Sequence, residues 1–130
     1  MKINFFKLIE YLYYFSLVVL FILYLFPGSL IGYFLYGNLG QQPNIINNPI
    51  GTSINHLFFF IFISKLSFSF RLKEKKFINS LQFLLLISIL LEILHYFIPN
   101  RAFEIYDLFA NCMGVGLGYL IVNIFLKRTK

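Results

Sequence analysis

The stretch EILHYFIPNRAFEIYDLFANCMGVGLG, residues 92–118, decides how this chain is expected to fold. Its centre is Pro99-Asn100, and both residue types favour turns. The apolar segments on either side are therefore predicted to be the two helices of a hairpin with this dipeptide at its tip. Counting outward from the tip, polar residues fall opposite one another: His95 opposes Glu104, Glu92 opposes Asp107, and Ser88 opposes Asn111.

Each helix of this hairpin is predicted to carry its polar residues on one face, because residues three and four apart share a helix face. On the second helix this face consists of Glu104, Asp107, Asn111, Gly114 and Gly118, and on the first of Ser88, Glu92 and His95. Gly114 and Gly118 form a G-x-x-x-G motif, which lets membrane helices pack closely. We expect the two glycines to face Leu85 and Leu81 of the first helix.

The rest of the chain is too apolar for a soluble domain. Only 12% of its 130 residues are charged, whereas an average globular chain carries about 25%. The apolar residues come in blocks of about twenty, the length a helix needs to cross a bilayer. The sequence therefore predicts an all-α integral membrane bundle, a single domain over residues 1–130. Its four transmembrane helices are expected at approximately residues 8–26, 54–70, 77–98 and 101–126.

The longest connection, residues 27–55, carries no charged residue. Its first part, Ser29–Tyr36, is apolar and aromatic but too short to cross a membrane, so we expect an interfacial or re-entrant piece. The following residues, 41–55, are rich in Pro, Asn and Gly and predict turns. Thr52-Ser53 then signals the start of the next helix, with His56 in its first turn.

The cations indicate the orientation of the bundle in the membrane. With four spans, nine of them share one side: Lys2, Lys7, Arg71, Lys73, Lys75, Lys76, Lys127, Arg128 and Lys130. The other side has only Arg101. The positive-inside rule then places both termini in the cytoplasm and the long loop, His56 and the hairpin tip outside. Because these cations flank apolar segments, the net charge of +6 indicates membrane orientation and argues against a nucleic-acid partner.

The acids near the hairpin tip are the strongest sequence argument for a functional site. Charged groups within membrane helices must be paired, hydrated or protonated. Glu92, Glu104 and Asp107 have only one permanent cation nearby, Arg101, whose side chain is long enough to reach an acid. Two negative charges therefore lack a partner. A carboxylate that holds a proton, a charged histidine or a bound cationic group would each correct this. The alternative is a purely structural, hydrogen-bonded clip that fixes the hairpin.

A metal centre is a further alternative. His56 and His95 together with Glu92 and Asp107 would supply nitrogen and oxygen ligands. Their spacing, however, matches no compact motif such as H-E-x-x-H. The sequence therefore predicts no metal and no other cofactor.

Seven residues at fixed spacing carry a family resemblance: Glu92, Pro99, Arg101, Asp107, Asn111, Gly114 and Gly118. This run resembles the C-terminal signature of the VanZ-like family, E-x-x-Q-x-F-x-P-x-R followed by D-x-x-x-N-x-x-G-x-x-x-G. His56, shortly before Phe58-Phe59, looks like the histidine of that family, while His95 stands where glutamine is usual. The resemblance implies a small multi-pass membrane protein of the bacterial cytoplasmic membrane. The family's namesake is an accessory factor in teicoplanin resistance.

Three functions follow as hypotheses. The first is an accessory role at the outer face of the cell membrane, in envelope function or glycopeptide resistance. The second is a membrane-embedded enzyme acting on a lipid or lipid-linked cell-wall precursor. The third is a structural subunit whose membrane-protein partner docks on Gly114 and Gly118. Candidate catalytic residues are Glu92, Asp107 and His56, and candidate binding residues are Arg101, Asn111, Glu104 and His95.

Overall fold

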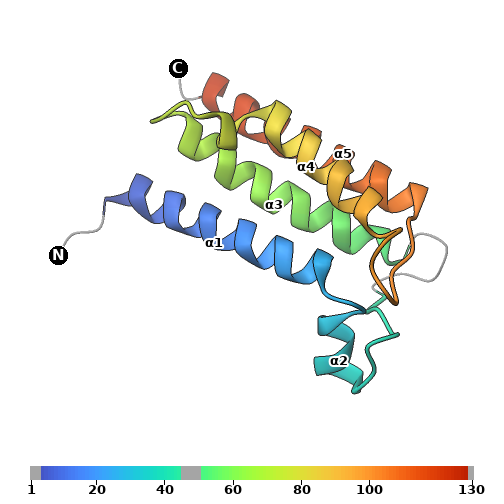
Figure 1. The fold of residues 1–130 in the computed structure, drawn as a ribbon. Coiled ribbons are helices and arrows are strands. Elements are labelled where there is room, and N and C mark those ends of the chain that lie inside the picture. Colours follow the sequence, from blue (N-terminus) through green and yellow to red (C-terminus); the bar gives the residue numbers. More distant parts are fainter. Residues whose placement is uncertain (1–3, 45–50, 129–130) are drawn as a thin grey trace.

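The computed structural model describes residues 4–44 and 51–128, and within these ranges it contains helices and no strand. The all-α class is thereby confirmed. Figure 1 shows the bundle and its labels. The α-helices are α1 (Phe5–Leu25), α2 (Leu30–Tyr36), α3 (Ser53–Arg71), α4 (Leu81–Leu94) and α5 (Ile105–Arg128), and a short 3-10 helix, η1 (Phe77–Asn79), precedes α4.

In the described part of the chain, three helices, α1, α3 and α5, are long and apolar enough to cross a membrane. The third of the four predicted spans is different. We expected a helix over residues 77–98, but α4 has only 14 residues, about 21 Å at 1.5 Å per residue. A bilayer core is about 30 Å thick. The bundle thus has three candidate spans and one shorter apolar helix.

Local hydrogen bonds explain why α4 is short. At its start the Ser80 hydroxyl accepts from the backbone N–H of Phe83 at 3.1 Å, which is a helix N-cap. At its end the backbone bonding tightens, since the N–H of Phe97 donates to the carbonyl of Leu94 three residues earlier. Pro99 then disfavours helical geometry in the preceding residue, and Asn100 adopts a left-handed φ of 58° at the tip.

The helix α5 begins at Ile105, four residues later than the predicted start at residue 101. The backbone N–H of Glu104 donates to Oε1 of Glu92 on α4 at 3.1 Å, and the carbonyl of Glu104 accepts the first helical bond, from Leu108. Residues 101–104 are therefore held outside the helix by contacts with α4 and, as shown below, with α1.

The closest helix packing is between α3 and α5. A Cβ built on Gly114 would lie 2.7 Å from the carbonyl oxygen of Leu57, and one on Gly118 would overlap Cβ of Ser64. Both contacts belong to α3, so the expected pairing of the glycines with Leu85 and Leu81 of α4 is wrong. Counting outward from the hairpin tip gives the position of a residue along α5. It does not say which neighbouring helix that residue contacts.

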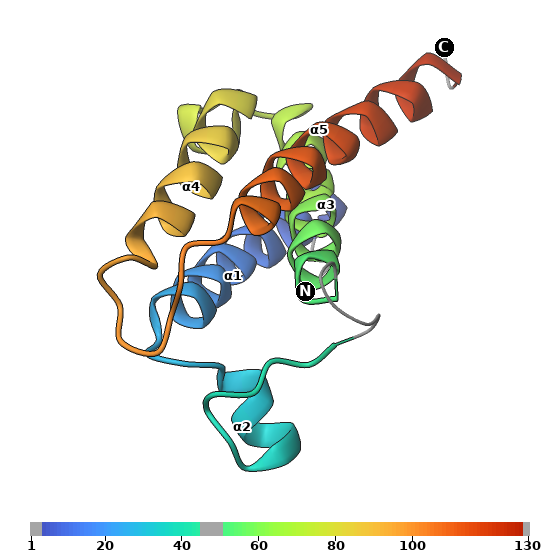
Figure 2. The same cartoon turned by 90° about the vertical axis from the view of Figure 1, so that its right-hand side faces the viewer.

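The two ends of the bundle differ in their elements and in their content of basic residues. Figure 1 shows the start of α1, the turn between α3 and α4 and the end of α5 at one end, and α2 with the α4–α5 connection at the other. The first end carries Lys7, the basic turn 71–76, Lys127 and Arg128, while Lys2 and Lys130 lie outside the described residues. Figure 2 shows that α2 projects away from the helix bundle. The apolar segment expected over Ser29–Tyr36 is this short helix, and the Ser29 hydroxyl caps it by accepting from the N–H of Gly32 at 2.9 Å.

Gly118→Ala is expected to destabilise the bundle, because the new methyl group would collide with Ser64 on the facing helix. Overpacking of this kind costs about 1–3 kcal/mol. Gly116→Ala is the matched control on the same helix, since nothing lies within 4 Å of a Cβ at that position, and alanine is the better helix former. Thermal unfolding of the detergent-purified proteins checks this. Equal melting temperatures for the two variants would contradict the close α3–α5 contact.

Candidate functional site

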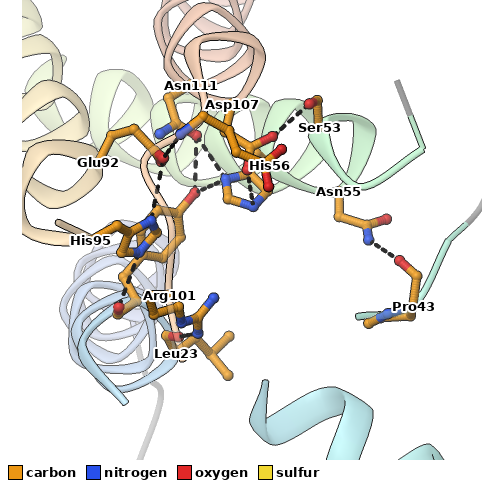
Figure 3. Close-up of polar contacts among 12 residues, drawn as sticks. Leu23, Pro43, Ser53, Asn55, His56, Glu92, His95, Arg101, Asp107 and Asn111 are labelled. Carbon is orange, nitrogen blue, oxygen red and sulfur yellow. Dashed lines mark hydrogen bonds and ion pairs between the residues drawn. The ribbon is translucent and has the colours of Figure 1, made fainter. Parts of the chain in front are cut away.

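The predicted polar stripes meet α1 and α3 at the end of the bundle that carries α2. Figure 3 shows the side chains and their contacts. We call the following group the polar cluster: Tyr24 of α1, Ser53 and His56 of α3, Glu92 of α4, His95 just after α4, and Asp107 and Asn111 of α5. All are buried except His56, whose side chain is 10% exposed. Four different helices therefore contribute to one group of titratable and hydrogen-bonding side chains.

His56 lies at the centre of the polar cluster. Its Nε2 is 3.5 Å from Oδ2 of Asp107, and its Nδ1 is 2.6 Å from the Tyr24 hydroxyl. The other oxygen of Asp107, Oδ1, accepts from the Ser53 hydroxyl at 2.5 Å. Tyr24 thus holds the ring of His56 in place, and Ser53 holds the carboxylate of Asp107.

The Tyr24 hydroxyl determines which ring nitrogen of His56 carries a proton. The single hydroxyl proton is donated to Oδ1 of Asn111 at 2.9 Å. The Tyr24 oxygen must therefore accept from Nδ1–H of His56. In the neutral ring, which carries one N–H, Nε2 is then unprotonated and directs its lone pair at Asp107.

A second histidine–carboxylate pair lies beside the first. Nδ1 of His95 is 3.3 Å from Oε1 of Glu92, and Nε2 of His95 is 3.1 Å from the backbone carbonyl of Tyr24. Because the carbonyl can only accept, Nε2 donates to it, and Nδ1 then faces the carboxylate of Glu92. The His95 ring also stacks on the Tyr24 ring, with centroids 5.4 Å apart. Tyr24 therefore touches both histidines.

Arg101 does not pair with an acid as expected. Its Nε donates to the carbonyl of Phe26 at 3.2 Å, and its Nη2 donates to the carbonyl of Leu23. These carbonyls lie at the C-terminal end of α1, where helix carbonyls lack internal partners and carry partial negative charge. Arg101 is therefore a helix cap that fastens the α4–α5 connection to α1.

Glu104, at the rim of the polar cluster, has a raised affinity for protons. Glu104, which precedes α5, has its pKa raised by partial burial and then by the negative charges of Asp107 and Glu92. The carboxylate of Glu104 therefore favours a proton or another positive charge beside it.

Two adjoining pockets open onto the polar cluster. The first, which we call the polar pocket, has a volume of about 260 Å³ and is lined by Gln42, His56, His95, Asn100, Arg101, Ala102, Glu104 and Asp107. The second, the apolar groove, has a volume of about 110 Å³ and is lined by Leu23, Tyr24, Ser29, Leu30, Ile31, Gln42, Pro43, Asn55, His56, Phe59 and Arg101. Gln42, His56 and Arg101 line both.

Most of the residues singled out in the sequence meet at this place. His56, Glu92, His95, Asp107 and Asn111 are in the polar cluster. Asn111 also lies opposite Ser88 as predicted, with its Nδ2 3.5 Å from the Ser88 carbonyl.

The remaining sequence candidates lie at the edge of the cluster or away from it. Glu104 and Arg101 line the polar pocket. Gly114 and Gly118 lie deeper, against α3.

Sequence reasoning missed Tyr24 and treated Ser53 only as a helix-start signal. No pattern distinguishes Tyr24 from the other tyrosines of the chain, which has nine. The one available signal was the need of a buried histidine for a hydrogen-bond partner on a neighbouring helix. That need does not say which helix supplies the partner.

Comparison with known proteins gives one match. The family model described as VanZ/LLP1 matches residues 11–126 of the chain. This range includes α2 to α4, most of α1 and α5, and the whole polar cluster. No curated protein and no solved structure matches the chain.

Tyr24→Phe is expected to destabilise the protein, because it removes the hydroxyl between His56 and Asn111 and leaves Nδ1 of His56 and Oδ1 of Asn111 poorly satisfied, with only their direct contact at 3.3 Å. Unsatisfied buried polar groups cost about 1–3 kcal/mol. Tyr11→Phe on the same helix is the matched control, since Tyr11 is 65% exposed. Thermal unfolding in detergent measures the difference. A Tyr24→Phe protein as stable as Tyr11→Phe would show that the hydroxyl contributes nothing.

Proposed function

The chain belongs to the VanZ/LLP1 family, and on this premise we propose that it is an accessory membrane protein of the cell envelope that binds an amphipathic lipid or lipid-linked precursor. The ligand lies at the end of the bundle that carries α2, with its polar head in the polar pocket and an acyl chain in the apolar groove. Protection against teicoplanin is the cellular role that the family resemblance suggests for this binding.

The observation that carries this proposal is that an apolar groove and a polar pocket lie next to each other and share the lining residues Gln42, His56 and Arg101. Leu23, Leu30, Ile31 and Phe59 give the groove an apolar wall, whereas acids, histidines and Arg101 line the polar pocket. Ligand sites are typically apolar cavities with a few polar groups that fix orientation. A ligand with one polar and one apolar end fits this pair of pockets better than a wholly polar solute does.

The charges of the polar pocket limit the kind of head group. Arg101 is permanently charged and suits a phosphate. Glu104 and Asp107 on the opposite side suit hydroxyl or ammonium groups, which donate hydrogen bonds to carboxylates. A phosphorylated head group that also carries hydroxyl or amino groups satisfies both.

The distribution of cations supports an outward-facing pocket. The basic residues of the described chain, apart from Lys65 within α3 and Arg101, gather at the end opposite to α2. By the positive-inside rule that end faces the cytoplasm. The polar pocket then faces the outside of a bacterial cytoplasmic membrane, where cell-wall precursors and glycopeptide drugs meet.

A catalytic role on the same ligand is the second candidate, and the two histidine–carboxylate pairs favour it. His56 with Asp107 and His95 with Glu92 are buried pairs that can hold and transfer protons. Tyr24 touches both histidines. Glu92 and Asp107 would divide the acid and base roles.

A role of Gly114 and Gly118 in docking a partner protein has less support than lipid binding or catalysis. Both glycines lie against α3 of the same chain, and a methyl group added at Gly114 would lie only 2.6 Å from Cβ of Phe60. A partner helix would have to displace α3 to reach them.

Ile31→Trp is expected to reduce the amount of lipid that co-purifies with the protein several-fold, because the larger ring narrows the apolar groove that Ile31 lines. Phe34→Trp is the control on the same short helix, since Phe34 is 82% exposed and lines neither pocket. Mass spectrometry of lipids extracted from the two detergent-purified proteins gives the comparison. Equal lipid content in both would refute binding in the groove.

Asp107→Asn tests the catalytic candidate, because it removes the charge that pairs with His56. Cells that express the wild type are expected to differ from empty cells in their lipid or cell-wall precursor profile, and the variant is expected to lose this difference. Teicoplanin susceptibility and membrane accumulation are measured in parallel. An unchanged profile in wild-type cells would rule out the enzyme and leave the binding proposal standing.

A further inference from the structure

Three side chains with metal-ligating atoms converge in the polar cluster from three helices. One ligand atom from each of His56, Glu92 and Asp107 lies within 4.8 Å of the other two. We propose that these residues form a binding site for one divalent transition-metal ion, zinc being the first candidate. The sequence predicted no metal because its ligands come from α3, α4 and α5 and form no local motif.

The contact between His56 and Asp107 has the geometry of two ligands and lacks the proton of a hydrogen bond in the neutral ring. Tyr24 fixes the proton of His56 on Nδ1, so the lone pair of Nε2 faces Oδ2 of Asp107 at 3.5 Å. Two lone pairs repel unless a proton or a metal ion lies between them. Zinc bonds of about 2.0–2.2 Å place neighbouring tetrahedral ligands about 3.4 Å apart. The observed distance matches that separation.

Glu92 supplies an independent indication. Its side chain is fully buried, and Oε2 has no hydrogen-bond partner among the described residues. A buried carboxylate oxygen without a partner is destabilising and calls for an explanation such as an ion.

The atoms that do not face the proposed ion are already hydrogen-bonded. Tyr24 accepts from Nδ1 of His56, and Ser53 donates to Oδ1 of Asp107. Oε1 of Glu92 contacts the ring of His95 and accepts from the N–H of Glu104. Such outer partners orient ligands and raise metal affinity. All three ligand side chains therefore have a supporting shell in place.

The ligand set selects the class of metal. Imidazole favours zinc, copper, iron or nickel, whereas magnesium and calcium prefer oxygen ligands alone. Three protein ligands leave a coordination position for a water. His56 and Asp107 also line the polar pocket, which gives an ion and a water access from outside. The inference does not depend on the lipid proposal, because the site can bind metal whether or not a lipid occupies the groove.

Metal content of the purified full-length protein tests the proposal. The protein is purified in detergent through a tag without histidine, and bound metals are measured by inductively coupled plasma mass spectrometry. About one zinc per chain is expected in the wild type, and at least tenfold less in His56→Gln, Glu92→Gln and Asp107→Asn, because each removes a ligand. Glu74→Gln is the matched control at the opposite end, where Glu74 is exposed and pairs with Lys76, and it should keep its zinc.

A second measurement uses the wild type alone, so that its result does not depend on whether a variant folds. The protein is stripped with a chelator and titrated with zinc or magnesium while its melting temperature is followed. A ligand that binds only the folded state raises this temperature, so zinc should raise it and magnesium should not. A wild-type protein that retains no metal and does not respond to zinc would overturn the site. The same conclusion would follow if the three ligand variants bound as much zinc as Glu74→Gln.

Discussion

The burial of Glu92 and Asp107 inside an apolar helix bundle is the constraint on which much of the local structure depends. An unpartnered charge in such a place is strongly destabilising, so neighbouring elements begin and end where they can supply partners. The helix α5 starts only after Glu104 has given its N–H to Glu92. The first residue of α3, Ser53, bonds to Asp107. The starts of α3 and α5 thus each supply a hydrogen bond to one of the two buried carboxylates.

The same end of the bundle is held together by bonds between distant parts of the chain. Arg101 fastens the α4–α5 connection to the last carbonyls of α1, and His95 bonds to the carbonyl of Tyr24. Deeper in the membrane-crossing part, Gly114 and Gly118 allow α5 to lie directly on α3. The close packing of α5 on α3 and the polar bonds at the end that carries α2 together fix the position of His56 relative to Asp107. This geometry determines what the site can do chemically.

The helical class, the polar stripes and most residues of the polar cluster could be predicted because they follow from periodicity and from the rarity of charge in apolar sequence. Ser88 opposite Asn111 was predicted for the same reason, since both lie at equal distance from the hairpin tip. Partners across helices could not be predicted. Tyr24, the carbonyl contacts of Arg101 and the packing of Gly114 on α3 all depend on how four helices are arranged around one another. The Ser80 cap at its start and backbone bonding at its end, and not hydropathy, set the length of α4.

The shortness of α4 has a consequence for the surrounding lipid. A helix of 14 residues extends about 21 Å, whereas the bilayer core measures about 30 Å. A bilayer adapts to a short apolar element by becoming thinner around it. Thinning at the end of α4 that carries the α4–α5 connection would bring the head-group layer closer to the polar pocket, which residues of that connection line. A lipid in this thinned rim would reach the pocket by moving sideways within its own leaflet, without its head group having to leave water first.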